Sequence, residues 1–277
     1  MSEAPSAAGA PLRITGAALR RDDRELWAGL DLEVQPGELL AVLGPSGSGK
    51  TTLLRAILGL ESLSAGRIEA LGRPVRRRGN RDIGYIPQQR PLPPETPLRG
   101  RDLVALGIDG HRFGFPVPRR GDRARVDALV DAVGARGFAD RPVGLLSGGE
   151  QQRLRVGQAL ADNPRLLLCD EPLTSLDLAN QQAVVGLIDA HRRRSDAAVL
   201  LVTHDINPVL GAVDRILYIA GGRFTLGTPD EVLTSRVLTD LYGAPVEVLR
   251  AGGRLVVVGA PDAEASHHHH HHDEASA

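Results

Sequence analysis

The sequence predicts an α/β fold, with a mostly parallel sheet and a separate helical lobe inserted into it. Three observations predict this. After residue 165, short apolar runs alternate with helix-length stretches, the pattern of βαβ units. The runs at 39–43 and 166–169 are apolar throughout, as expected for strands covered on both faces. Between them, prolines crowd 87–97 and two helical stretches follow, so we expect the helical lobe at about 89–165.

The individual elements follow in chain order. We expect strands at 12–19, 30–34, 39–43, 83–86, 166–169, 199–203 and 215–219, with a charged turn at 22–25. We expect helices at 50–58, 99–106, 123–133, 151–160 and 178–192, and a short helix between 203 and 215.

Paired glycines predict two hairpins, and the composition of the two termini predicts segments without regular structure. Gly221-Gly222 and Gly252-Gly253 predict hairpin turns, because adjacent glycines accept a left-handed backbone. The second turn joins 246–249 to 255–258, in a C-terminal hairpin extension at 244–260. We expect a disordered leader at 1–11 and a flexible tail at 261–277.

Composition excludes some classes of function. The 277 residues carry 33 Lys and Arg against 34 Asp and Glu, a net charge of −1, which gives no argument for a nucleic-acid partner. No run approaches the roughly 18 apolar residues of a membrane helix, and residues 1–11 do not resemble a signal peptide. Any association with a membrane is therefore expected to occur through a partner.

The arginine clusters and the cysteine are interpreted as structural. Two arginine-rich runs are expected to be solvated loop and helix-end charge; they comprise Arg73, Arg76, Arg77, Arg78 and Arg81, then Arg192, Arg193 and Arg194. The single cysteine, Cys169, cannot form a disulfide within the chain and lies in an apolar run, so we expect a core residue.

A phosphate-binding loop is the first motif that carries chemistry. Residues 44–51 match G-x-x-x-x-G-K-[ST], with a predicted strand before and a predicted helix after. Glycines let successive N–H groups form an anion-binding nest, and the helix presents its positive end to phosphates. Lys50 is expected to reach the β- and γ-phosphates, and the Thr51 hydroxyl to bind Mg²⁺. The predicted ATP-binding residues here are Gly44, Pro45, Ser46, Gly47, Ser48, Gly49, Lys50, Thr51 and Thr52.

Two further motifs follow the helical stretches. The apolar run 166–169 ends in Asp170, expected to hold Mg²⁺, and Glu171, expected to polarise the attacking water. Ser147-Gly148-Gly149-Glu150 has the pattern of a capping box, which opens a helix without any ligand. A cap does not require the two glycines, however, and they would let a phosphate approach the N–H groups of the helix start.

With these motifs in this order, segment 146–152 resembles the signature motif of ATP-binding cassette (ABC) transporter ATPases, and the resemblance covers about residues 12–243. It implies a P-loop NTPase with a RecA-like core, an antiparallel β subdomain and the helical subdomain. It also implies a homodimer in which Ser147, Gly148 and Gly149 of one copy contact the ATP bound by the other. By the same resemblance, Gln88 is a Mg²⁺-contacting Q-loop glutamine, Asp177 belongs to the D-loop and His204 reaches the γ-phosphate.

One position departs from the family pattern. The aromatic side chain that usually stacks on adenine should fall near residue 21, where the chain has Arg20, Arg21 and Asp22. A guanidinium plane can stack on a base, so Arg21 is a candidate, while Trp27 is expected in the core.

The resemblance also suggests a cargo. Residues 98–107, 227–233 and 241–243 resemble the bacterial zinc/manganese importer ATPases, although ferric-siderophore importers have similar endings. The tail contains six consecutive histidines, which favour zinc binding but also have the form of an engineered tag: His267, His268, His269, His270, His271 and His272.

The expected function is therefore an ATPase subunit at the cytoplasmic face of the membrane. Its implied partners are a second copy, integral-membrane permease subunits and an extracytoplasmic binding protein, with ATP and Mg²⁺ as cofactors. The alternatives are an importer ATPase for iron-siderophore or haem, and a non-transport regulatory ABC ATPase of the cell-division type.

Overall fold

The computed structural model describes residues 9–21, 24–76, 80, 82–88, 92–110 and 121–259. Several expectations fall outside these residues. They are most of the leader at 1–11, Asp22, the arginines at 77, 78 and 81, and the histidine-containing tail at 261–277.

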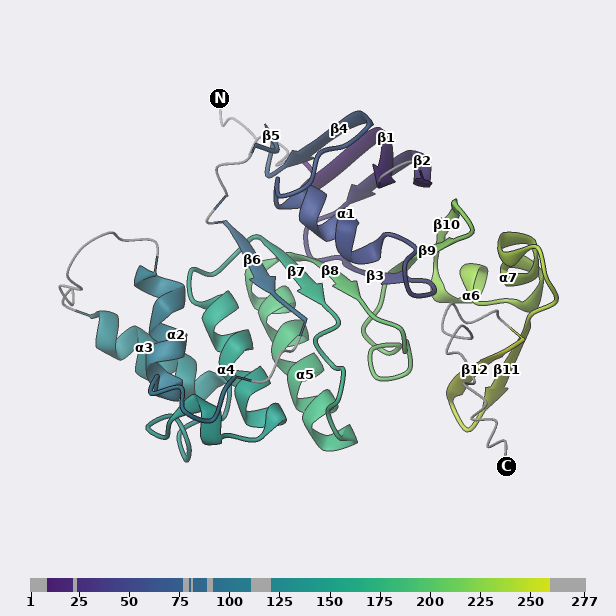
Figure 1. The fold of residues 1–277 in the computed structure, drawn as a ribbon. Coiled ribbons are helices and arrows are strands. Elements are labelled where there is room, and N and C mark those ends of the chain that lie inside the picture. The colour runs from purple at the N-terminus through teal and green to yellow at the C-terminus, as the bar shows by residue number, and fades with distance from the viewer. Residues whose placement is uncertain are drawn as a thin grey trace, which may run out of the picture.

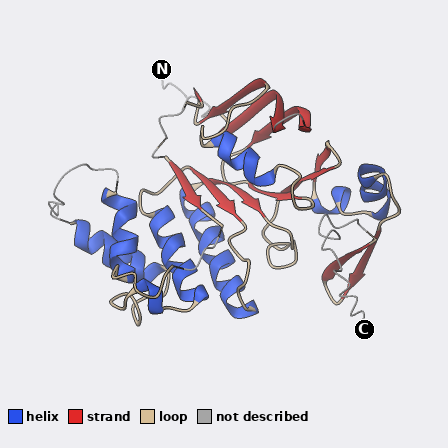
Figure 2. Ribbon diagram, in the orientation of Figure 1, coloured by secondary structure: helices blue, strands red, loops and turns tan. Residues whose placement is uncertain are grey.

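A six-stranded sheet forms the centre of the molecule, in the order β10-β9-β3-β8-β7-β6 (Figures 1 and 2). Neighbouring strands from β9 to β6 run parallel, and only the edge strand β10 is antiparallel. The strands are β3 (Leu39–Leu43), β6 (Ile83–Ile86), β7 (Leu166–Asp170), β8 (Ala198–Val202), β9 (Arg215–Ala220) and β10 (Arg223–Gly227). The mostly parallel sheet predicted from the apolar runs is therefore confirmed.

A second sheet, antiparallel and in the order β2-β1-β4-β5, covers one face of the first across helix α1 (Lys50–Ile57). Its strands are β1 (Leu12–Arg21), β2 (Arg24–Val34), β4 (Ala65–Ala70) and β5 (Arg73–Pro74). The prediction that 24–29 precede the second strand was wrong, because Leu26 and Trp27 bury their side chains here and extend the strand. Successive side chains of β3 point to opposite faces of the sheet and so enter two different cores. Leu40 and Val42 pack towards α1, whereas Leu39, Ala41 and Leu43 pack on the opposite face.

The helical lobe lies beside the sheet, as Figure 2 shows. Its elements are α2 (Gly100–Asp109), α3 (Asp122–Ala132), the short 3-10 helix η1 (Val143–Leu145) and α4 (Gly148–Leu160). A separate apolar cluster joins them, including Val104, Val130 and Leu154. Helix α5 (Leu178–Ser195) contributes Val184 and Ile188 to the sheet's core and links lobe and sheet.

The chain between β8 and β9 forms turns instead of the predicted short helix. The N–H of Val209 donates to Ile206 O and the N–H of Ala212 donates to Val209 O. These bonds span three residues, as in turns, and the segment contains no helix. Pro208 has no N–H and disfavours helical geometry at the preceding residue, and Gly211 weakens any helix further. Two helices that we did not predict, α6 (Pro229–Val232) and α7 (Ser235–Tyr242), then lead to the hairpin of β11 (Glu247–Ala251) and β12 (Arg254–Val258).

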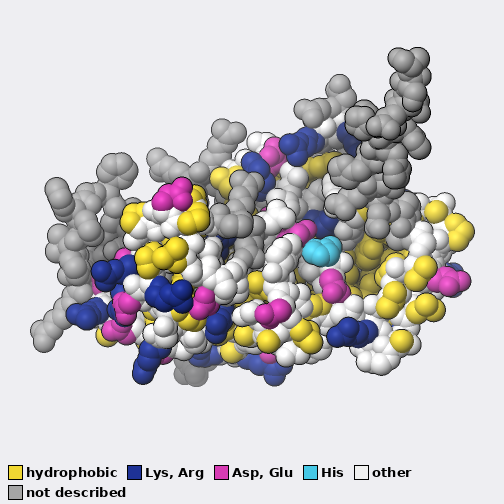
Figure 3. Space-filling view, turned by 60° about the horizontal axis from the view of Figure 1, so that its bottom comes forward, with side chains coloured by type: hydrophobic (Ala, Val, Ile, Leu, Met, Phe, Trp, Pro, Cys, Tyr) yellow, Lys and Arg dark blue, Asp and Glu magenta, His cyan; other side chains and the backbone are white. Residues whose placement is uncertain are grey.

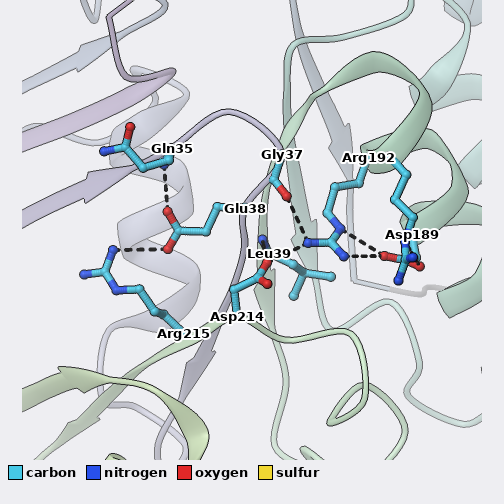
Figure 4. Close-up of polar contacts among 9 residues, drawn as sticks. Gln35, Gly37, Glu38, Leu39, Asp189, Arg192, Asp214 and Arg215 are labelled. Atoms are coloured by element: carbon cyan, nitrogen blue, oxygen red, sulfur yellow. Dashed lines mark hydrogen bonds and ion pairs between the residues drawn. The ribbon is translucent and has the colours of Figure 1, made fainter.

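A buried arginine holds the strand that leads into the phosphate loop (Figure 4). Arg192, near the end of α5, donates to Gly37 O at 2.9 Å, to Asp214 Oδ2 at 2.6 Å and to Asp189 Oδ1 at 2.9 Å. The same Asp214 oxygen accepts the N–H of Leu39, the first residue of β3. The prediction of solvated charge was thus wrong for Arg192, because three elements bring acceptors to its guanidinium.

The visible surface agrees with the composition. In Figure 3, basic and acidic side chains are interspersed, and hydrophobic side chains gather over the C-terminal hairpin, where Leu249, Val256, Val257 and Val258 are exposed. Among the described residues, no helix is both long and apolar enough to cross a membrane.

Candidate active site

The loop between β3 and α1 is shaped by glycines. Gly44, Gly47 and Gly49 have φ of 142°, 76° and 95°, in the region that L side chains rarely adopt. A Cβ at Gly44 would also lie 2.0 Å from Ile219 O, so close approach of strand β9 independently requires glycine there. The loop therefore takes the turned-in form that the motif predicts, and α1 begins directly at Lys50.

The Lys50 side chain spans this loop. Its ammonium donates to Gly44 O and to Pro45 O, each at 2.8 Å. Burial lowers the pKa of Lys50, while the nearby carboxylates of Glu171 and Asp170 act in the opposite direction. The charged end of Lys50 thus lies among backbone oxygens at the place where the motif expects phosphate.

A cavity of about 270 Å³ opens beside the loop. Its lining residues are Arg21, Leu26, Ser46, Gly47, Gly49, Lys50, Thr51, Thr52 and Glu171. Arg21, the candidate for the adenine contact, is among them, whereas Trp27 is buried as expected. Leu26, the third residue of β2, was not predicted to line the cavity, because it belongs to no sequence motif.

Asp170 joins the end of β7 to the start of α1. Its Oδ1 accepts from the Thr51 hydroxyl at 2.9 Å and its Oδ2 from the Tyr85 hydroxyl at 3.4 Å. Burial raises the pKa of Asp170, although the Thr51 hydrogen bond lowers it. Burial and then Asp170 raise the pKa of Tyr85 to about 12, so this phenol remains a donor. The Thr51 hydroxyl lines the cavity and the Asp170 carboxylate is bonded to it, and both are oxygen ligands of the kind that Mg²⁺ prefers.

Three side chains converge on one oxygen of Glu171. Its Oε2 accepts from Gln88 Nε2 at 3.4 Å and from the Thr174 hydroxyl at 3.1 Å, and lies 3.6 Å from Nδ1 of His204. Glu171 has φ of 47°, a left-handed conformation that is uncommon for a residue with a side chain, and its N–H bonds Val202 O. The three predicted catalytic residues, Glu171, Gln88 and His204, are thus together at the end of β7. Thr174 was missed, although its place three residues after Glu171 in a turn is a signal that could have identified it.

The signature segment begins helix α4 in the helical lobe. Ser147 Oγ accepts from Glu150 N at 3.3 Å and Glu150 Oε2 accepts from Ser147 N at 2.8 Å, so the predicted capping box is formed. A Cβ at Gly149 would lie 2.5 Å from the side chain of Asn180, which in turn bonds both carboxylate oxygens of Asp177 at 3.0 Å. Within this chain, Ser147, Gly148, Gly149 and Asp177 therefore lie together, but they are not among the residues that line the cavity.

The described residues contain no cluster of three or more His, Cys, Asp or Glu side chains placed to hold a metal ion. The six tail histidines lie outside those residues.

Comparisons with known proteins agree with this geometry. The ABC transporter family matches residues 27–174. A zinc import ATP-binding protein (ZnuC) of Cereibacter sphaeroides is 37% identical over 226 residues, which are 82% of this chain and 86% of that relative. An Fe(3+) ions import ATP-binding protein (FbpC) of Streptomyces avermitilis is 39% identical over 80% of this chain and 63% of its own length. The solved structure of cbiO1 from Clostridium perfringens, part of the ABC transporter complex cbiONQ, superimposes with a TM-score of 0.70 at 25% identity, over 84% of this chain and 94% of that one.

The structure, with its antiparallel sheet and helical lobe, thus has the P-loop NTPase fold and shares its fold with a solved ABC transporter subunit. Together with the phosphate loop, these matches identify the molecule: the chain belongs to the ABC transporter family and is an ATP-binding ATPase of that family.

Proposed function

We propose that this chain hydrolyses Mg-ATP with Glu171 as the base for the attacking water. The observation that carries this role is the convergence of Gln88, Thr174 and His204 on Oε2 of Glu171, at the cavity lined by the phosphate loop. Water attacks the γ-phosphorus, its proton passes to Glu171, and the bond to the β–γ bridging oxygen breaks to leave ADP and inorganic phosphate.

The remaining roles follow from the positions of the charged groups. Lys50 and the loop N–H groups hold the phosphates, and Thr51, Asp170 and Gln88 hold Mg²⁺. When bound, Mg²⁺ neutralises charge that develops on the phosphate oxygens. His204 contacts the γ-phosphate. Its Nδ1 lies 3.6 Å from Oε2 of Glu171, so both groups are at the same end of the site.

Two copies complete the site in this proposal. Ser147, Gly148, Gly149 and Asp177 lie away from their own chain's cavity, which supports a head-to-tail pair in which they contact the ATP of the partner subunit. ATP would stabilise the closed pair because it binds that state far better than the open one.

The test is Glu171→Gln in the full chain. We expect ATP binding to persist, hydrolysis to fall by at least about 100-fold and ATP to trap a dimer in size-exclusion chromatography. Glu61→Gln, at an exposed acid paired with Arg55, is the matched control and is expected to hydrolyse ATP normally. Normal turnover in Glu171→Gln would remove the assignment.

We propose further that hydrolysis powers import of a divalent metal, zinc or manganese, through permease subunits at the cytoplasmic face of the membrane, with an extracytoplasmic binding protein delivering the ion. The zinc import relative supports this cargo, since it matches over most of both chains. The second candidate cargo is iron-siderophore or haem, and the relative named for import of Fe(3+) ions, at similar identity, supports iron in general.

Cellular metal content distinguishes the cargoes. In metal-limited cells whose only copy carries Glu171→Gln, we expect a selective fall in zinc or in manganese. A fall in iron alone would favour the second candidate. No change in any metal, with no multi-helix permease co-purifying, would favour a non-transport regulator of the cell-division type.

A further inference from the structure

The C-terminal hairpin is held to the core by a small number of specific bonds. Strands β11 and β12 form a sheet of their own, and a two-stranded sheet is marginally stable without support. Val246 and Leu255 bury their side chains in the core of the main sheet. The Val246 N–H donates to Thr239 Oγ1 at 3.0 Å, and the Val248 N–H donates to Ser235 Oγ at 2.9 Å, so helix α7 supplies one side of the attachment.

The other side of the attachment is a single asparagine in the turn segment after β8. Asn207 Oδ1 accepts from Leu255 N at 2.8 Å, and Asn207 Nδ2 donates to Leu255 O at 2.9 Å. Both backbone groups of Leu255 are therefore paired with one side-chain amide, which takes the place of a neighbouring strand. The atom Nδ2 also donates to Asp205 Oδ1 at 2.9 Å, and the Asn207 N–H donates to the same oxygen at 2.9 Å.

This amide is connected to His204 by a continuous set of bonds. Asp205 N and Asp205 O both bond the Thr203 hydroxyl, at 3.2 and 2.8 Å, which closes a tight turn around His204. Thr203 N in turn bonds Val42 O in the strand that leads into the phosphate loop. The His204 side chain is 62% exposed, so packing does little to orient it. Its direction towards Glu171 therefore depends on the turn that Thr203, Asp205 and Asn207 build.

We propose that Asn207 is a positioning residue for ATP hydrolysis, which ties the C-terminal hairpin to the turn that presents His204. The inference rests on the proposed role of His204. It makes the two Leu255 bonds, and not the α7 side of the attachment, a determinant of the chemical step, because their loss frees the amide that holds Asp205 in place.

A double-mutant cycle in the full chain tests this. We expect Asn207→Ala to lower kcat by at least about fivefold with little change in the KM for ATP, since residues in one hydrogen-bond network are energetically coupled. In a His204→Ala background, Asn207→Ala is expected to lower kcat no further. Ser235→Ala is the matched control: it removes a hairpin bond of the same kind on the α7 side, and kcat is expected to stay normal.

Each contrary result has a distinct meaning. Equal losses from Asn207→Ala with and without His204 would overturn the inference, because the asparagine would then be merely structural. Normal kcat in Asn207→Ala beside a slow His204→Ala would overturn it while leaving the proposed function intact. Normal hydrolysis in His204→Ala would remove the role of His204 and the inference together. If Asn207→Ala does not fold, Asn207→Asp, which keeps an acceptor for Leu255 N but loses the donor, is used in the same cycle with the same expected loss.

Discussion

The hydroxyl of Thr51, on the first turn of α1, donates a 2.9 Å hydrogen bond to Oδ1 of Asp170, the last residue of β7. Two motifs that are 119 residues apart in sequence thus meet at one oxygen. The same carboxylate is buried, and burial raises its pKa because a negative charge is unfavourable in such surroundings.

Asp170→Asn is expected to stabilise the nucleotide-free protein while nearly abolishing Mg²⁺-dependent hydrolysis. The raised pKa of Asp170 means that its ionisation disfavours the folded state at neutral pH. The penalty is absent below the unfolded-state pKa of about 3.9, because the carboxyl is then neutral in both states. Thermal unfolding without Mg²⁺ should therefore show a higher Tm for the variant at pH 7.5 and a difference that shrinks towards pH 3. A lower Tm at pH 7.5 would contradict this.

Thr174→Val is expected to slow hydrolysis about tenfold, since a hydrogen bond to a charged group contributes about 1.5–3 kcal/mol. The hydroxyl donates to Oε2 of Glu171 at 3.1 Å, and valine keeps the shape without the donor. The measurement is kcat for ATP, with Thr174→Ser as the control that restores the donor. If the serine variant were as slow as the valine variant, the hydrogen bond would not be the cause.

Trp27 should report nucleotide binding by its fluorescence. It is the only tryptophan of the chain, it is fully buried, and its Nε1 would lie 2.9 Å from a Cβ placed on Gly49. Within the described residues this N–H has no hydrogen-bond partner, so changes in the loop alter its surroundings directly. We expect Mg-ATP to change the emission and Lys50→Ala to suppress that change. An unaltered spectrum in a chain shown by dialysis to bind ATP would refute the prediction.

Arg192→Met is expected to lower the free energy of unfolding by about 2 kcal/mol. This loss is smaller than for breaking a fully buried ion pair, because the Asp214 side chain is 49% exposed. Arg193→Met is the matched control one position along α5. Its side chain is 68% exposed and contacts only Asp189 among the ion pairs of the described residues, so we expect at most about 0.5 kcal/mol. Denaturant unfolding of both variants makes the comparison, and equal effects would contradict it.

The parts of the fold that the sequence predicts are those where local pattern and burial agree. The run at 39–43 is apolar at every position and is buried at every position, so the strand was predicted with its true bounds. Strands β4 and β5 were missed because most of their residues are exposed, so the pairing of β4 with β1 and of β5 with β4 depends on tertiary contacts. Arg192 has the same sequence signal as Arg193, and the approach of Gly37 and of Asp214, which precedes β9, distinguishes them.

The site divides in the same way. Motifs predict roles for Lys50, Asp170 and Glu171 because each has a fixed place beside a strand end. Tyr85 and Asn207 make side-chain bonds to residues far away in the chain, and the sequence contains no spacing that reveals such bonds. Thr174 differs, because its bond to Glu171 spans only three residues.

The left-handed backbone of Glu171 restricts how this position can diverge. At φ of 47°, the β-branched residues valine, isoleucine and threonine meet steric strain whatever their chemistry, whereas asparagine, aspartate and glycine are tolerated. A duplicated gene that no longer needs to hydrolyse ATP would therefore accept only a few residue types at position 171. An inactive copy that has lost the Glu171 carboxylate would still carry, at position 171, a residue that accepts the left-handed backbone of this turn.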